Sequence, residues 1–226
     1  MNAFNDLSIV IPVGQGDTAW RPLLEDLVAL GEAPEIILSA CEKSPSDVEW
    51  PGNVKWFQSQ QGRGHQLNVG AQEASRKIIW FVHADTRLTP AVNGALKHFI
   101  QHGGPGLGYF RLKFATDGPW QTRLNAWAAN VRSRYFSLPF GDQGFIVNKT
   151  VFEQLNGFDK RVVPGEDLDF VVRLQAAGLP LQQLPADLIT SARRYRQYGW
   201  LTTTVRHIYL TGLLARQARQ RLEQAI

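Results

Sequence analysis

The chain has 226 residues, of which 44% are hydrophobic and 19% charged, and its formal net charge is +4. This composition is that of a globular protein and excludes a disordered chain, while the length favours one large domain. No stretch approaches the roughly 20 apolar residues that a membrane-spanning helix needs. Residues 1–6 contain no basic segment ahead of a long apolar run, so we expect no signal peptide. The single cysteine, Cys41, indicates a reducing compartment, and we therefore predict a cytoplasmic protein.

Strand and helix patterns alternate along the chain. A buried strand, Leu7–Val13, ends in a loop where Asp17 or Thr18 could cap the next helix. Alternation at this spacing predicts right-handed βαβ units and an α/β fold with a mainly parallel central sheet flanked by helices. The other predicted strands span 35–40, 54–58, 77–82, 106–114 and 145–147, and the predicted helices span 20–30, 65–75, 90–102, 120–135, 166–177 and 200–223.

An apolar run that stops abruptly marks the first candidate site. Residues 78–82 are typical of a strand buried in a parallel sheet, and His83 and Asp85 follow it directly. Polar groups just beyond a strand lie where open α/β sheets hold their ligands. An imidazole and a carboxylate at this spacing could share one divalent ion that offsets the charge of a diphosphate. Alternatively, Asp85 is a turn residue and His83 a satisfied polar group.

A second acidic cluster opens the helix predicted at 166–177. Asp167, next to Glu166, could act as a general base that removes a proton from an attacking hydroxyl. Acidic residues in a first helical turn also complement the helix dipole, which is the simpler explanation. Asp169 and Arg173 are four residues apart and fit a surface ion pair.

Several residues in glycine-flanked turns are candidates for ligand contacts. Arg63 precedes a helix and could contact phosphate with the help of the helix N-terminus, or could be a solvated loop residue. Arg194, in the basic segment 191–195, is either part of an anion clamp or the start of a basic tail. Asp142 is favoured in its turn for backbone reasons, although its position before a strand leaves contact with an acceptor open.

The loop after the first strand also resembles a dinucleotide-binding loop, because Gly14, Gly16 and Ala19 follow the strand in order. Pro12 and Trp20 crowd the position of the pyrophosphate, and the second strand ends without an acidic residue for the ribose. The sequence therefore gives little support to a nicotinamide or flavin protein.

The order of these motifs resembles the family 2 glycosyltransferases of the GT-A fold, and most of all the small bacterial subgroup found beside radical-SAM and selenium-related genes. The similarity covers residues 7–196. It lies in the first strand and in residues 62–64, 68–71, 81–86, 140–144, 155–159 and 165–167, with Arg173 and Gly178. The resemblance implies a single GT-A-like domain over 1–196. The remaining residues, 197–226, are predicted from their own pattern to form a basic amphipathic C-terminal helix.

The resemblance also implies an activity and a site. The activity is the metal-dependent, inverting transfer of a sugar from a nucleoside-diphosphate sugar to an acceptor hydroxyl. Asp85 and His83 would hold Mn²⁺ or Mg²⁺, and the Glu166–Asp167 pair would supply the catalytic base at Asp167. The substrate-binding positions that it implies are Pro12, Arg63, Asn68, Asp142 and Arg194.

The sequence departs from the family pattern at the donor site. No acidic residue follows the first strand before Asp17, and the turn after the second strand, 39–42, lacks the usual Asp that contacts the nucleotide base. The alternative is therefore a non-catalytic nucleotide-sugar-binding or scaffold protein of the same fold.

The C-terminal segment is basic and periodic. Residues 193–222 contain seven arginines and no acidic residue, and Leu201, Val205, Ile208 and Leu213 recur at helical spacing. This pattern predicts a helix that packs on its own domain or on a second copy, or an interfacial helix on anionic lipid at the inner face of the membrane. The chain has no zinc-finger spacing, RNA-binding-sheet signature or basic heptad region, so nucleic acid is not an expected partner. Trp80 and Trp127 are expected in the core rather than as stacking platforms.

Overall fold

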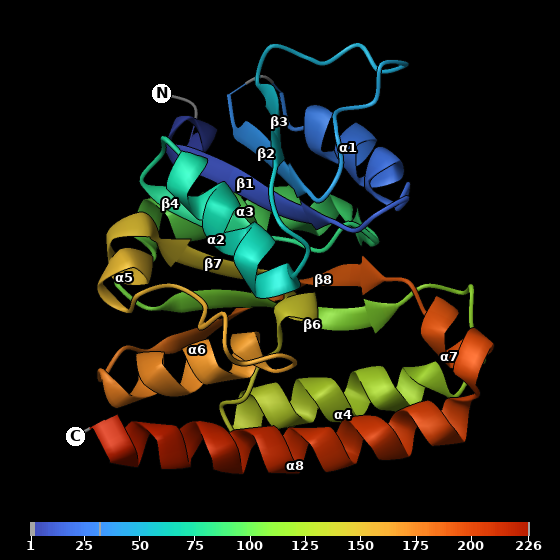
Figure 1. Cartoon of the computed structure of the whole chain (residues 1–226), viewed down its shortest axis with the longest axis vertical. Coiled ribbons are helices and arrows are strands. Elements are labelled where there is room, and N and C mark those ends of the chain that lie inside the picture. Colours follow the sequence, from blue (N-terminus) through green and yellow to red (C-terminus); the bar gives the residue numbers. More distant parts are fainter. Residues whose placement is uncertain (1–2, 32, 226) are drawn as a thin grey trace.

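The computed structural model describes residues 3–31 and 33–225 and shows one sheet between layers of helices (Figure 1). Residues 1, 2, 32 and 226 lie outside the described part, so the expectation about a signal peptide falls partly there. The strands are β1 (Leu7–Val13), β2 (Glu35–Ala40), β3 (Val54–Gln58), β4 (Ile78–Phe81), β5 (Thr86–Leu88), β6 (Leu107–Phe114), β7 (Phe145–Asn148) and β8 (Leu181–Thr190). The α-helices are α1 (Trp20–Val28), α2 (Arg63–Glu73), α3 (Pro90–His102), α4 (Thr122–Tyr135), α5 (Lys149–Gln154), α6 (Glu166–Ala176), α7 (Arg193–Tyr198) and α8 (Trp200–Ala225); the 3-10 helices are η1 (Ala3–Asp6) and η2 (Gly141–Gln143). The predicted α/β fold with a long C-terminal helix is confirmed.

The first four strands of the sheet are parallel. The strand order is β3-β2-β1-β4-β7-β6-β8-β5, and β3, β2, β1 and β4 pair in parallel. β1 is buried except for Pro12, and β2 is buried throughout, which explains their unbroken apolar sequences. Val10 of β1 pairs with Phe81 of β4, and the N–H of Val82 donates to the carbonyl of Val10 (3.0 Å). The loops that follow β1 and β4 therefore open at the same edge of the sheet.

The second half of the sheet contains the elements that the sequence analysis missed. β7 is antiparallel to β4 and β6, β8 is parallel to β6, and β5 is antiparallel to β8. β8 was missed because Pro185 interrupts its pattern and its register against β6 shifts between Tyr109 and Arg111. β5, α5 and α7 were missed because three or six residues are too few to show periodicity.

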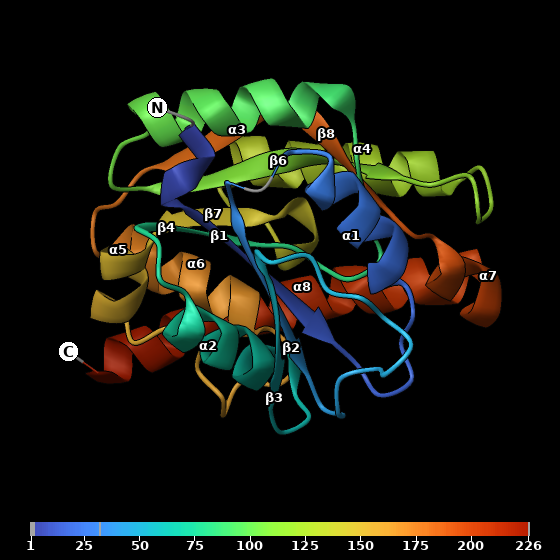
Figure 2. The same ribbon diagram turned by 90° about the horizontal axis from the view of Figure 1, so that it is seen from above.

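Each face of the sheet has its own apolar core. α1 and α3 cover one face, and α2, α5 and α6 cover the other (Figure 2). Trp80 is fully buried between β1 and β7, as predicted. Trp127 is 67% exposed, so the prediction that it lies in the core was wrong; α4 buries Ala126 and Ala129 instead.

The predicted side-chain cap of α1 is absent. Asp17 accepts a hydrogen bond from the N–H of Ala19 (2.9 Å), but neither Asp17 nor Thr18 caps the helix.

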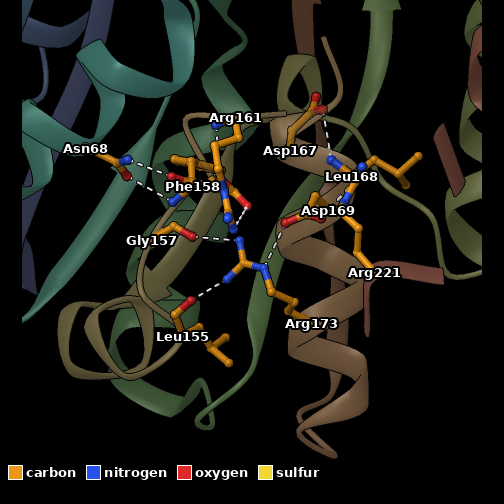
Figure 3. A network of polar contacts seen from close by, with 11 residues as sticks. Asn68, Leu155, Gly157, Phe158, Arg161, Asp167, Leu168, Asp169, Arg173 and Arg221 are labelled. Carbon is orange, nitrogen blue, oxygen red and sulfur yellow. Dashed lines mark hydrogen bonds and ion pairs between the residues drawn. The ribbon is translucent and has the colours of Figure 1, made fainter. Parts of the chain in front are cut away.

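α8 lies beneath α4 and α6 at the end of the molecule opposite β3 (Figure 1). Asp169 of α6 pairs with Arg173 (2.8 Å) and with Arg221 of α8 (3.2 Å), as Figure 3 shows. The side chain of Asp169 is 5% exposed, so the prediction of a surface ion pair was wrong. The guanidinium of Arg173 also donates to the carbonyls of Leu155 and Gly157, which holds it in the interior.

Two further findings concern the C-terminal region. The predicted boundary between residues 196 and 197 falls inside α7, and the division of the chain stays a prediction. Among the described helices, none combines the length and the apolar composition needed to cross a bilayer.

α6 begins at a glycine pressed against α8. Gly165 has a φ of 110°, and a Cβ at this position would lie 2.9 Å from Cδ1 of Leu214. Both the backbone conformation and the contact therefore require glycine here. Because α6 begins at Gly165, the same contact positions the acidic first turn of that helix.

We expect Gly165→Ala to destabilise the protein more than Gly178→Ala, which is the matched control. Gly178, just beyond α6, also has a positive φ (73°) but has nothing within 4 Å of its Cβ position. Each alanine should lower the free energy of unfolding by about 1–3 kcal/mol through backbone strain, and overpacking against Leu214 should add about 1–3 kcal/mol at position 165. Denaturant unfolding measures both, and equal losses would contradict the packing contribution.

Candidate active site

The loop after β4 and the start of α6 meet at η2. β4 ends at Phe81, and the chain continues through His83 and Asp85. A Cβ at Gly141 of η2 would lie 3.2 Å from Nε2 of His83 and 3.2 Å from Oδ2 of Asp167. The candidate metal-binding segment and the candidate base therefore lie in one site.

Asp167 is buried in the first turn of α6 and is held by three groups. Its Oδ2 accepts a hydrogen bond from the N–H of Gly141 (2.8 Å) and lies 3.3 Å from Nη2 of Arg63, and its Oδ1 accepts from the N–H of Leu168 (2.9 Å). Burial raises the pKa of this carboxyl, but Arg63 and the two N–H groups outweigh burial and hold the pKa below its ordinary value. Asp167 is therefore ionised at neutral pH, as a general base must be.

Arg63 bridges Asp167 and Glu166. Its Nε lies 2.5 Å from Oε1 of Glu166, whose Oε2 accepts a hydrogen bond from the N–H of Gly165 (3.0 Å). Burial lowers the pKa of Arg63, but the two carboxylates raise it above its ordinary value. Arg63 begins α2 rather than preceding it, and in this structure it is the counter-ion of two acids. Both oxygens of Glu166 are engaged, which suits a residue that positions its neighbour.

The imidazole of His83 lies beside this ion pair and forms no hydrogen bond with any described residue. Burial, with the positive charges of Arg63 and Arg194, lowers the pKa of His83 to about 3, while Asp167 acts in the opposite direction. The ring is therefore neutral at physiological pH. A neutral imidazole is the form that binds metal ions.

Asp85 is partly buried and only loosely paired. Its Oδ1 lies 3.5 Å from Oγ1 of Thr190, and its Oδ2 lies 3.6 Å from Nη2 of Arg193. Burial raises the pKa of this carboxyl, and Arg193 and Arg194 oppose that effect. These long contacts leave the carboxylate oxygens accessible to a further partner.

Asp142 of η2 has a buried carboxylate oxygen, Oδ1, without a hydrogen-bond partner among the described residues. Burial raises the pKa of Asp142 to about 6, although Arg132 acts to lower it. The guanidinium of Arg132 in turn stacks 3.6 Å from the ring of Phe140. A buried carboxylate oxygen normally has a protein, water or ion partner, so this atom is available to a ligand.

The donor set fits a divalent ion that a substrate helps to hold. No group of three or more His, Cys, Asp or Glu side chains with metal-binding geometry occurs within residues 3–31 and 33–225. His83 and Asp85 supply one imidazole nitrogen and one loosely paired carboxylate. Mg²⁺ is usually bound through one or two carboxylates together with substrate phosphates, and carboxylates suit Mn²⁺ equally. These residues therefore fit an ion whose coordination shell a diphosphate would complete, rather than an ion coordinated by the protein alone.

Of the other predicted substrate-binding residues, Arg194 lies near this cluster, and Pro12 lies at the edge of the sheet where the loops after β1 and β4 open. Pro12 is half-buried near the carboxyl end of β1, paired in register with Ser39 of β2. Arg194 is exposed near the start of α7, and its positive charge acts on His83 and Asp85.

Asn68 lies outside the cluster. Its side-chain amide donates to the carbonyl of Phe158 (2.7 Å) and accepts from the N–H of the same residue (2.9 Å), as Figure 3 shows. It also lines a separate cavity of about 720 Å³ between α2 and the loop after α5. The structure thus gives Asn68 the task of fixing that loop, and substrate contact by Asn68 stays a prediction.

Three contributions to the site escaped the sequence analysis. Thr190 ends β8, the strand that was missed, and Arg132 lies on α4 far from any recognised motif. Gly141 contributes a backbone N–H and the absence of a side chain. The glycine-rich turn at 140–144 was recognised, but residue types alone do not show which N–H points at Asp167.

We expect Arg63→Gln to destabilise the protein by about 1–2 kcal/mol, because it leaves Glu166 and Asp167 as buried charges without a counter-ion. The Arg63 side chain is 39% exposed, so solvent screening keeps the loss below that of a fully buried pair. Since the folded-state pKa of Asp167 lies below the ordinary value of 3.8, this stability is present above that pH and is lost as the pH falls further.

Denaturant unfolding of the Arg63→Gln variant across pH checks this expectation. Arg161→Gln is the control, because Arg161 pairs with Asp159 on the surface with its side chain 89% exposed, and its loss should have no measurable effect. Equal effects of the two substitutions, or a loss that persists unchanged in acid, would contradict the assignment.

No protein-family model and no curated protein sequence matches the chain. Solved structures with a similar fold include S. aureus TarS 1–349, with a TM-score of 0.56 and 14% identity, covering 83% of this chain and 58% of that chain. The same fragment in complex with UDP-GlcNAc has a TM-score of 0.56 and 15% identity, covering 83% and 56%. GalNAc-T7 with UDP, GalNAc and Mn²⁺ has a TM-score of 0.59 and 14% identity, covering 82% and 43%. The chain thus spans roughly half the length of these structures, and its fold is the GT-A fold that the resemblance implied.

Proposed function

We propose that the chain is a metal-dependent, inverting glycosyltransferase of family 2 that moves a sugar from a nucleoside-diphosphate sugar to an acceptor hydroxyl. One observation supports the proposal: the imidazole of His83, two residues before Asp85, and the carboxylate of the base candidate Asp167 both lie beside Gly141. In a direct displacement, the leaving diphosphate and the attacking hydroxyl lie on opposite sides of one sugar ring. The two groups must therefore be near one another without touching.

The donor half of the site is formed by Asp85, His83 and the arginines of α7. A divalent ion held by Asp85 and His83 would neutralise charge on the leaving diphosphate. Arg193 is 3.6 Å from both Asp85 and Asp17, and such a distant pairing leaves its guanidinium free to bind phosphate oxygens. Arg194 adds a second positive charge near His83. These residues bind and orient the diphosphate.

The acceptor half of the site is formed by Asp167 with its supports. Asp167 is ionised, and Gly141 and Arg63 fix its Oδ2. It takes the proton of the acceptor hydroxyl as that oxygen forms a bond to the anomeric carbon and the bond from this carbon to the diphosphate oxygen breaks. Attack from the face opposite the diphosphate inverts the configuration. Asp142, with its unpartnered oxygen, accepts a hydrogen bond from a sugar or acceptor hydroxyl.

We expect Asp167→Asn to lower the transfer rate by about 10²–10⁴-fold, because the amide cannot accept the proton. Asp85→Asn should lower it at least about tenfold through weaker binding of the metal and diphosphate. Release of nucleoside diphosphate from a panel of nucleotide sugars, with Mn²⁺ or Mg²⁺ and candidate acceptors, measures both effects. Asp187→Asn is the control, because Asp187 pairs with Arg111 outside the site and its loss should leave the rate unchanged. An active wild type with unimpaired Asp167→Asn and Asp85→Asn variants would reject these roles.

A non-catalytic nucleotide-sugar-binding protein of the same fold is the second candidate. The observation that favours it is at the turn after β2, where the carboxylate of Glu42 accepts the N–H of Gly16 through both oxygens (3.3 Å each). The acidic group nearest the end of β2 is thus used within the protein rather than offered to a nucleotide base.

Calorimetry separates the two candidates from a protein that binds no nucleotide. For both candidates we expect a nucleoside diphosphate to bind more tightly with Mn²⁺ than without it. Asp85→Asn should remove the metal-dependent part of the affinity, at least about tenfold, while Asp167→Asn should keep it. Binding without turnover, over the whole acceptor panel, favours the binding protein; an absence of binding by every nucleotide tested excludes both.

A further inference from the structure

The exposed apolar side chains of this protein gather on a few helices at one end of the molecule. Among the described residues, eleven of the thirteen large apolar side chains that are exposed lie in 120–136 or 198–213, the region of α4, α7 and α8. Single exposed apolar residues need no explanation, but a concentration of this kind marks an interaction surface.

The first half of α8 turns its apolar side outward. Leu201, Val205 and Ile208 are 64%, 56% and 70% exposed. The opposite side of the helix contacts α6 and α7 and carries polar groups, including the buried Thr203. The helix therefore does pack on its own domain, as one alternative from the sequence held, but not through the apolar stripe. The stripe that a helix usually buries faces away from the protein.

α4 extends this surface. Asn125 of α4 donates a hydrogen bond to Thr204 (3.0 Å) and accepts one from Nε1 of Trp200 (2.6 Å), so the two helices are fixed side by side, as Figure 1 shows. We call the exposed apolar residues of α4 and of the first half of α8, together with Trp120 just before α4, the α4–α8 face. Its members are Trp120, Leu124, Trp127, Tyr135, Leu201, Val205, Ile208 and Tyr209.

The charge around the α4–α8 face is strongly positive. The chain has 24 lysine and arginine residues, and ten of them, all arginine, lie on α4, α7 and α8. Of the 20 acidic residues, only Glu223 lies on these three helices. The three helices therefore carry a formal charge of +9, and the rest of the chain carries −5. Eight of the ten arginines, including Arg206, Arg216 and Arg219 on α8, are exposed.

The charge and the apolar side chains of this face together indicate which kind of partner it binds. A second copy would place the exposed arginines of one face, among them Arg206, Arg216 and Arg219, against those of another, which opposes a symmetric dimer. Nucleic acid would satisfy the arginines but offers no apolar phase for Leu201, Val205 and Ile208. An anionic bilayer offers phosphates to the arginines, acyl chains to the aliphatic side chains and an interface at which Trp and Tyr are favoured. We infer that the α4–α8 face docks the protein peripherally on an anionic lipid surface. This inference does not depend on the proposed function.

Co-sedimentation of the full chain with vesicles tests the inference. We expect binding to vesicles of equal parts phosphatidylcholine and phosphatidylglycerol, little binding to phosphatidylcholine alone, and weaker binding as salt is raised. The combined substitutions Leu201→Gln, Val205→Gln and Ile208→Gln should weaken binding about tenfold or more, because they remove apolar contacts with the acyl region. Glutamine favours helix, so the substitutions should leave the fold intact, which circular dichroism and thermal unfolding verify.

A charge-matched pair of variants tests the basic contribution. Arg206→Gln, Arg216→Gln and Arg219→Gln together should weaken binding about tenfold or more. Lys43→Gln, Arg76→Gln and Lys97→Gln remove the same charge from exposed positions outside α4, α7 and α8, and they should weaken binding less. The inference is overturned if the chain does not bind anionic vesicles, or if the variant with Leu201→Gln, Val205→Gln and Ile208→Gln binds them as well as the unmodified chain. It is also overturned if analytical ultracentrifugation shows a dimer that the apolar variant dissociates, or if oligonucleotides bind through this face and vesicles do not.

Discussion

The pairing of Arg63 with Glu166 and Asp167 is the contact on which the site depends. It joins α2 to α6 across 103 residues of sequence, and both carboxylates are buried beneath a half-exposed guanidinium. A positive partner offsets the mutual repulsion of two adjacent buried carboxylates, and Arg63 helps to hold the pKa of Asp167 below its ordinary value. The ion pair therefore favours the ionised form of Asp167 that the proposed base catalysis requires, and it also fixes the direction in which Asp167 points.

The rest of the site follows the same balance of charge. Asp85 and Asp142 add two more acidic groups, and Arg193 and Arg132 are positioned to oppose them. The distances within these ion pairs differ: Nε of Arg63 lies 2.5 Å from Oε1 of Glu166, whereas Nη2 of Arg193 lies 3.6 Å from Oδ2 of Asp85. The loosely held charges are the ones that an anionic donor can recruit at low cost, because few hydrogen bonds must break. In the proposed function, the tight pair of Arg63 lies on the acceptor side and the loose pair of Arg193 with Asp85 lies on the donor side.

The sequence predicted those features that follow from local pattern. The apolar run of β1 and the polar residues after β4 placed the sheet edge correctly, since periodicity and strand ends are visible in residue types. The sequence did not show that Arg63 pairs with Glu166, because a contact between residues 103 positions apart depends on tertiary packing. For the same reason the prediction that Trp127 lies in the core was wrong: which side of α4 faces the domain depends on tertiary packing, and that side carries Ala126 and Ala129. The bulged β8 escaped because its alternation is broken.

α8 is the clearest case in which pattern and packing diverge. Its apolar stripe, Leu201, Val205 and Ile208, is exposed, and the protein contacts the other side of the helix instead. Leu214 packs there against Gly165, and the polar contacts join Thr204 with Asn125, His207 with Tyr195 (3.2 Å), and Arg221 with Asp169 (3.2 Å). Hydrogen bonds and ion pairs hold the helix in register, and they leave the aliphatic side chains in water, where each exposed Å² is disfavoured by about 25 cal/mol. A helix oriented this way gains stability when another apolar phase covers it. The orientation of α8 thus has a physical rationale in a surface outside the protein rather than in its own core.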